Sequence, residues 1–132
     1  MLITRETDYA VRTVLHLARQ EGETVSVPDI ATAMQIPRSF LAKILQRLVR
    51  AGLVNSVRGV RGGFGLARRP AEISLFAIMH AIQGSAGINA CAVEGGRCGL
   101  SRACAVHPVW VDLRSQVERR LRRETIARLL KL

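Results

Sequence analysis

Three cysteines and a histidine lie close together in the second half of the chain, and their residue types are those of a metal site. Cys91, Cys98 and Cys104 follow the pattern C-x6-C-x5-C, and His107 lies three residues beyond the last cysteine. Thiolates are preferred ligands of iron–sulfur clusters and zinc, and imidazole binds both as well. The spacing differs from that of ordinary zinc fingers and ferredoxins, so three unrelated small cysteines remain an alternative interpretation.

The segment that holds these cysteines, residues 84–106, lacks helical periodicity and contains five glycines. An irregular stretch of this length within a small domain is usually functional. The first residues do not have the profile of a signal peptide, and no apolar run approaches the roughly 20 residues that span a bilayer. We therefore expect a cytoplasmic protein with no membrane partner. In such a protein an odd number of cysteines favours metal or redox chemistry over disulfides.

The second chemical feature is the charge balance. The 132 residues include 20 Lys and Arg but only 10 Asp and Glu, a formal net charge of +10. Between Asp29 and Glu72 there is no acidic residue. A polyanion such as nucleic acid is the natural partner for such a chain. Because no nucleotide-binding loop, acid–base pair or activated nucleophile accompanies these residues, we do not expect an enzyme. The basic residues of the window are Arg38, Lys43, Arg47, Arg50, Arg58, Arg61, Arg68 and Arg69.

Hydrophobic periodicity predicts several helices around the basic window. Residues 5–20 form an amphipathic helix behind Thr4, and Ser26 begins a short helix that runs to about Met34. The clearest helix follows Pro37, carries a basic face opposite one apolar stripe, and ends at Gly52. Its stripe consists of Leu41, Ile44, Leu45, Leu48 and Val49.

After this helix the pattern changes to a β-hairpin. Residues 53–58 and 66–68 are expected as strands around a glycine-rich turn, and Ser74 begins another helix. Residues 108–123 form a long helix, and Thr125 begins a short final one. This order predicts a mainly α fold with a small β-hairpin wing, a winged helix-turn-helix followed by a long helix. The long helix has a coiled-coil-like apolar stripe of Trp110, Leu113, Val117 and Leu121.

The basic helix and the hairpin suit double-stranded DNA. Ser39 is short enough to allow close approach in the major groove, where Arg38 and Lys43 can reach guanine or phosphate. Arg58 and Arg61 on a thin hairpin tip can enter the minor groove. The alternative interpretation is an ordinary solvated helix followed by a flexible turn. The absence of acidic residues, together with the helix pair and the hairpin, favours DNA binding.

Four stretches resemble one known family, the dimeric winged-helix iron–sulfur transcription regulators that include IscR, NsrR and RirA. The stretches are MLITRETDYAVR, IPRSFLAKILQRLVRAGLV, VRGVRGGFGLAR and CAVHPVW. The resemblance implies a homodimer joined through the long helix by Trp110, Leu113, Val117 and Leu121, a palindromic operator, and an iron–sulfur cluster on Cys91, Cys98 and Cys104. By the same resemblance the DNA-contacting residues are Arg38, Ser39, Lys43, Arg47, Arg58 and Arg61.

The resemblance leaves the fourth cluster ligand open. Some members of the family use a histidine just after the third cysteine, which His107 matches; others use an aspartate of the first helix of the other subunit, which Asp8 matches. We favour Asp8 with a [4Fe–4S] cluster over His107 with a [2Fe–2S] cluster. Each residue also has a simpler interpretation, Asp8 as an ion-pair partner of Arg5 or Arg12 and His107 as a residue of a helix start.

The sequence therefore predicts a DNA-binding transcription regulator, a repressor whose operator affinity is gated by a cluster that senses iron, redox state or nitric oxide. Residues 1–83 are expected to bind DNA, 84–106 to hold the cluster, and 107–132 to form the dimerisation helix and a C-terminal helix. One alternative is a metal-free regulator that acts through a thiol switch. A second is an iron–sulfur electron-transfer protein, which leaves the winged helix unexplained.

Overall fold

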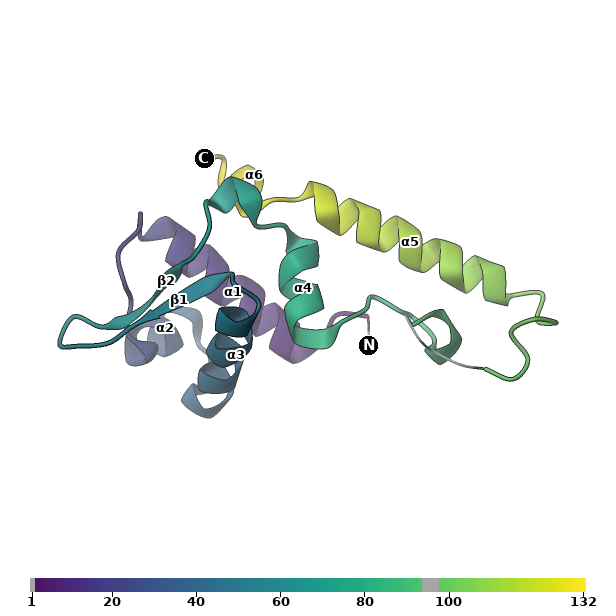
Figure 1. Ribbon diagram of the computed structural model, residues 1–132, viewed down its shortest axis with the longest axis horizontal. Coiled ribbons are helices and arrows are strands. Elements are labelled where there is room, and N and C mark those ends of the chain that lie inside the picture. Colours follow the sequence, from purple (N-terminus) through teal and green to yellow (C-terminus); the bar gives the residue numbers. More distant parts are fainter. Residues whose placement is uncertain (1, 94–97) are drawn as a thin grey trace.

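The structure, a computed structural model, describes residues 2–93 and 98–132. It is mainly helical with one antiparallel hairpin, which confirms the predicted fold class (Figure 1). None of the helices in this part of the chain is long and apolar enough to cross a membrane. The α-helices are α1 (Arg5–Arg19), α2 (Val27–Met34), α3 (Arg38–Arg50), α4 (Leu75–Gln83), α5 (His107–Arg123) and α6 (Ile126–Leu130), the strands are β1 (Val54–Val57) and β2 (Gly63–Leu66), and η1 (Pro70–Glu72) and η2 (Ala90–Ala92) are single 3-10 turns.

Local capping explains where the first helices begin and end. The side chain of Thr4 accepts a hydrogen bond from the backbone N–H of Thr7, and Ser26 does the same for the N–H of Asp29. Gln35 then adopts a left-handed conformation, with φ of 54°, and turns the chain into α3. The predicted apolar stripe of α3 is buried at Leu41, Ile44, Leu45 and Leu48. The helix pair expected from the sequence is therefore confirmed.

The hairpin forms as expected, but its second strand lies earlier than predicted. Strand β2 is Gly63–Leu66, not 66–68, and its Phe64 pairs with Val25 as well as with Ser56 of β1. A Cβ atom on Gly63 would lie 2.4 Å from the carbonyl oxygen of Val25. The glycines that looked like turn residues are therefore strand residues, because a third backbone segment packs directly against them.

The core lies between α1, α3 and α4, and the last helix closes it. Ile30, Ile73, Ile78 and Ile126 are fully buried in one cluster with the α3 stripe. Helix α6 reaches this core because the N–H of Ile126 bonds to the carbonyl oxygen of Ile73 at 2.9 Å. The C-terminal helix thus packs on the same body as the N-terminal helices.

Helix α5 projects from this body as a long rod and carries the cysteine segment at its far end (Figure 1). It packs against α4, where the guanidinium of Arg122 lies 3.5 Å from the ring centre of Phe76, and against η2. None of its residues is fully buried. Within the predicted stripe Trp110, Val117 and Leu121 are partly buried and Leu113 is exposed. Val109 is exposed as well, so part of the apolar surface of α5 lies uncovered in the single chain.

Candidate nucleic-acid interface and cysteine loop

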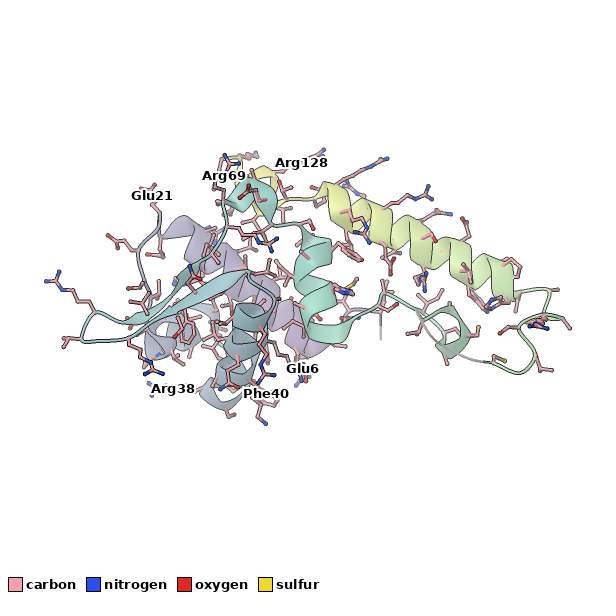
Figure 2. All side chains as sticks on the ribbon, in the orientation of Figure 1. Glu6, Glu21, Arg38, Phe40, Arg69 and Arg128 are labelled. Atoms are coloured by element: carbon pink, nitrogen blue, oxygen red, sulfur yellow. The ribbon has the colours of Figure 1, made fainter. Side chains whose placement is uncertain are left out.

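The outer face of α3 presents the predicted DNA-contacting residues to solvent. Arg38, Ser39, Lys43 and Arg47 are all exposed, at or after the start of the helix. Figure 2 shows Arg38 and Phe40 at the outer edge of the molecule, on the side opposite Arg69 and Arg128. The buried stripe on the other side of α3 fixes the orientation of this face. Helix α3 itself has no acidic residue, so it presents an exposed, basic surface of the kind that enters a major groove.

Sequence reasoning missed Phe40, which lies on the same face. Its side chain is 46% exposed, and its ring centre is 6.4 Å from that of Tyr9 in α1. A small cavity of about 200 Å³ lies beside it, lined by Glu6, Phe40, Lys43, Ile44 and Arg47. The sequence signal that could have singled out Phe40 is its type, because a large apolar side chain is unusual on the polar face of a helix. Phe40 provides an apolar surface of the kind that contacts the methyl group of thymine.

The wing is fixed to the body rather than free. The N–H and carbonyl of Val25 bond to Phe64 at 2.9 Å each, and the hydroxyl of Thr24 donates to the carbonyl oxygen of Arg61 at 2.9 Å. Arg58 and Arg61 are exposed on the wing, and Val60 between them is fully exposed at its tip. The connection between α1 and α2 thus holds the backbone of the wing at Arg61 and Phe64. The contact made by Thr24 joins residues 37 positions apart and was not predicted from the sequence.

The base of the wing carries a local ion pair. The guanidinium of Arg69 bonds to a carboxylate oxygen of Glu72 at 3.1 Å, and the backbone N–H of Arg69 bonds to the other oxygen. These hydrogen bonds hold the pKa of Glu72 below its ordinary value. Figure 2 places Arg69 far from Arg38, so this pair stabilises the turn η1 and lies outside the DNA face.

The three cysteines lie on the segment between α4 and α5, all as free thiols. Cys91 is on η2 and half-buried, Cys98 is exposed, and Cys104 is half-buried. Within residues 2–93 and 98–132, no three or more Cys, His, Asp or Glu side chains are gathered closely enough to hold a metal ion. Residues 94–97 of the predicted cluster-binding loop lie outside the described residues. The described part of this segment thus contains cysteine side chains that can bind a metal, but in this structure they are not close enough together to do so.

The two candidates for the fourth ligand have different surroundings. Asp8 is half-exposed on α1 and forms an ion pair of 2.6 Å with Arg12, one of the two partners expected from the sequence. His107 begins α5, one residue earlier than predicted, and its Nδ1 atom is buried without a hydrogen-bond partner among the described residues. Three free thiols and an unpaired imidazole nitrogen fit an iron–sulfur cluster in their chemistry.

The start of the cysteine segment is tied to α1 by one side chain. The side-chain Oε1 atom of Gln83 accepts hydrogen bonds from the N–H of Thr4 and the hydroxyl of Thr7, at 3.0 and 2.7 Å. Its amide nitrogen donates to the carbonyl oxygens of Leu2 and Ser85, at 2.8 and 3.0 Å. Gln83 therefore connects the N-terminal segment with the first residues after α4.

The helix pair, the basic outer face of α3 and the fixed wing define a winged helix-turn-helix protein that binds DNA. The chain belongs to the Rrf2 family, whose model is described as an iron-dependent transcriptional regulator and matches residues 3–132. It is therefore a transcription regulator and not an enzyme. One relative is the HTH-type transcriptional regulator NsrR of Geobacillus kaustophilus, 37% identical over 106 residues, which cover 79% of this chain and 72% of the relative.

Two solved structures share the fold over nearly the whole chain. IscR of T. potens is 28% identical, with a TM-score of 0.76 over 98% of this chain and 85% of the other. The oxidized form of Staphylococcus aureus CymR is 25% identical, with a TM-score of 0.77 over 100% of this chain and 98% of the other. The predicted resemblance to the IscR and NsrR regulators is confirmed.

Proposed function

We propose that the protein is a homodimeric repressor that binds a palindromic operator and is gated by an iron–sulfur cluster. The observation that carries DNA recognition is the acid-free outer face of α3, with Arg38 and Lys43 exposed and the wing fixed near it. Arg38, Ser39, Lys43 and Arg47 contact the major groove, while Arg58 and Arg61 enter the minor groove. Two copies related by a two-fold axis then recognise two half-sites about 34 Å apart.

The three parts of the chain divide this work. Residues 1–83 bind DNA, residues 84–106 hold the cluster through Cys91, Cys98 and Cys104, and residues 107–132 provide dimerisation and return to the core with α6. Dimerisation through Trp110, Leu113, Val117 and Leu121 is supported by the projection of α5 from the body and by the apolar surface left uncovered on it. The cluster, when bound, supplies a redox- and ligand-sensitive centre. Cys91, Cys98 and Cys104 would hold the cluster, and their movement on its gain or loss would change the conformation of the cysteine segment and thereby the spacing of the two α3 helices.

Asp8 and His107 are the two candidates for the fourth ligand of the cluster. Asp8 would have to give up its ion pair with Arg12 and be supplied by a second copy of the chain. His107 already has a buried Nδ1 atom that lacks a partner among the described residues. This nitrogen favours His107 and a [2Fe–2S] cluster over the combination of Asp8 and [4Fe–4S] that the sequence favours. We expect His107→Ala to release iron faster than Asp8→Ala, and the opposite order would return the role to Asp8.

Operator binding by loaded and stripped protein tests the proposal. The protein is purified without oxygen, its iron and sulfide are measured, and DNA sites are selected from a random pool at fixed salt. We expect inverted repeats to be enriched and their affinity to differ between the loaded and metal-free dimer. Equal affinity of the two forms would reject cluster gating and leave the DNA-binding assignment intact.

A metal-free thiol switch is the second candidate function. All three cysteines are free, Cys98 is exposed, and a solved structure of similar fold is described as an oxidized form. A colourless anaerobic preparation with little iron, combined with operator affinity that changes after mild oxidation, would favour this candidate. Substituting Cys98 with Ser should then abolish the response.

A further inference from the structure

Two buried polar nitrogens lack hydrogen-bond partners among the described residues, and both lie on α5. They are Nδ1 of His107 and Nε of Arg114. Because an α-helix has 3.6 residues per turn, positions seven residues apart lie on the same face of the helix. Buried polar groups are rarely left unpaired, and unpaired ones call for an explanation. This face of α5 therefore carries two buried nitrogens for which the described part of the chain supplies no partner.

Arg114 connects this face directly to the turn that carries Cys91. Its Nη1 atom donates a 2.9 Å hydrogen bond to the carbonyl oxygen of Ala92, the residue after Cys91, 22 positions earlier in the chain. Ala92 is fully buried, and its own N–H closes the turn by bonding to Asn89 at 3.0 Å. One side chain of the long helix thus holds η2 in place.

The surroundings of Arg114 differ from those of other arginines on the helix. Its side chain is 23% exposed, and its Nε atom lies 3.9 Å from a carboxylate oxygen of Glu118, within ion-pair range but too far for a hydrogen bond. Arg119, by contrast, is exposed to solvent. Partial burial of a guanidinium is costly unless its hydrogen-bond donors are used. One donor of Arg114 bonds to Ala92, and its Nε–H has no hydrogen-bond partner among residues 2–93 and 98–132.

We propose that Arg114 is a positioning residue that docks the Cys91 turn onto α5 and thereby places a positive charge beside the segment whose cysteines hold the proposed cluster. The second half of this inference rests on the proposed cluster function. A cluster bound by thiolates carries negative charge, so a nearby cation stabilises it and favours its reduced form. The docking half concerns the metal-free chain alone.

The first experiment uses reduced, metal-free protein and needs no cluster. Cys91 and Cys98 are alkylated with iodoacetamide, and the two rates are followed by mass spectrometry in wild type, Arg114→Met, Arg114→Lys and the control Arg119→Gln. We expect Arg114→Met to speed alkylation of Cys91 by about tenfold, the effect of one lost charged hydrogen bond, and to leave Cys98 unchanged. Arg114→Lys, which keeps a charged donor, should recover part of the protection. Hydrogen exchange at the Ala92 N–H should follow the same order.

The second experiment uses anaerobically reconstituted protein and measures the reduction potential and the rate of iron loss to a chelator. Arg114→Met should lower the potential and speed iron loss, Arg114→Lys should restore the potential, and Arg119→Gln should match wild type. If wild type binds no iron, the cluster function fails and the alkylation result still decides the docking. If wild type binds iron but Arg114→Met changes neither alkylation nor potential, the inference is overturned and the cluster function stands.

Discussion

The Nη1 atom of Arg47 in α3 donates a hydrogen bond of 3.2 Å to the carbonyl oxygen of Ile82, near the end of α4. The next residue, Gln83, bonds to α1 through Thr7 and to Ser85 at the start of the cysteine segment. Helix α3 is thus joined to the point where the cysteine segment begins. A rearrangement of that segment has a direct physical route to α3.

Arg47→Met is expected to reduce the coupling between the cysteine segment and DNA binding. The substitution also removes a proposed DNA contact, so both affinities should fall. Without the bond to Ile82, a change after α4 is transmitted to α3 less strongly, so the ratio of loaded to metal-free operator affinity should also move toward one. Fluorescence anisotropy with a labelled operator at fixed salt measures both affinities. Lys43→Met is the matched control, because Lys43 is exposed on the same helix. It should weaken binding and keep the ratio, and a similar loss of ratio in both variants would contradict this role for Arg47.

Replacing the wing arginines should change the salt dependence of binding. Arg58 and Arg61 are exposed on a wing that is fixed to the body. If they contact phosphates from the minor groove, Arg58→Ala with Arg61→Ala should weaken binding and flatten the log–log salt slope by roughly 0.9 per lost contact. Titrations at several salt concentrations give the slope. Lys131→Ala, an exposed basic residue after α6, serves as the control and should leave the slope unchanged.

Thr24→Val should weaken DNA binding without any change in the residues that touch DNA. The substitution removes the hydroxyl that bonds to the carbonyl oxygen of Arg61 and so loosens the wing. One neutral hydrogen bond is worth about 1 kcal/mol, so operator affinity should fall by no more than about fivefold. Thr24→Ser keeps the hydroxyl and should bind like wild type. Equal binding by both variants would show that the wing does not need this contact.

Gln83→Leu should destabilise the fold. Four hydrogen bonds are lost, and the hydroxyl of the buried Thr7 loses its acceptor on Gln83. We expect a loss of about 3 kcal/mol in the free energy of unfolding, measured by urea denaturation of the metal-free protein. Gln46→Leu, on the exposed face of α3, is the control and should be nearly neutral. A loss below about 1 kcal/mol would mean that water replaces these bonds.

Helix α3 shows which structural features the sequence can predict. Its apolar stripe, its basic outer face and its end near Gly52 all follow from spacing and residue type, and the structure confirms them. Thr4, Ser26, Ser74 and Thr125 cap the helices that they were expected to cap. These features are local, because a cap or a stripe depends on residues within a few positions of each other.

The position of β2 shows where prediction from local residue types fails. Gly63 and Gly65 are typical turn residues, yet both lie in the strand, because Val25 pairs with Phe64 from 39 positions away. Spacing along the chain cannot reveal this contact. The same holds for Phe40, whose place beside Tyr9 depends on how α1 packs against α3.

The sequence by itself determined the helix order, the winged helix-turn-helix class, the basic outer face of α3 and the three thiols between α4 and α5. Only the tertiary structure decided how these parts are joined: Arg47 to Ile82, Thr24 to Arg61, Gln83 to Thr7 and Arg114 to Ala92. Each of these bonds links residues 22 or more positions apart. Such contacts form only after the apolar faces have packed and set the distance between the elements. The spacing of residues within a few positions of each other therefore cannot predict them.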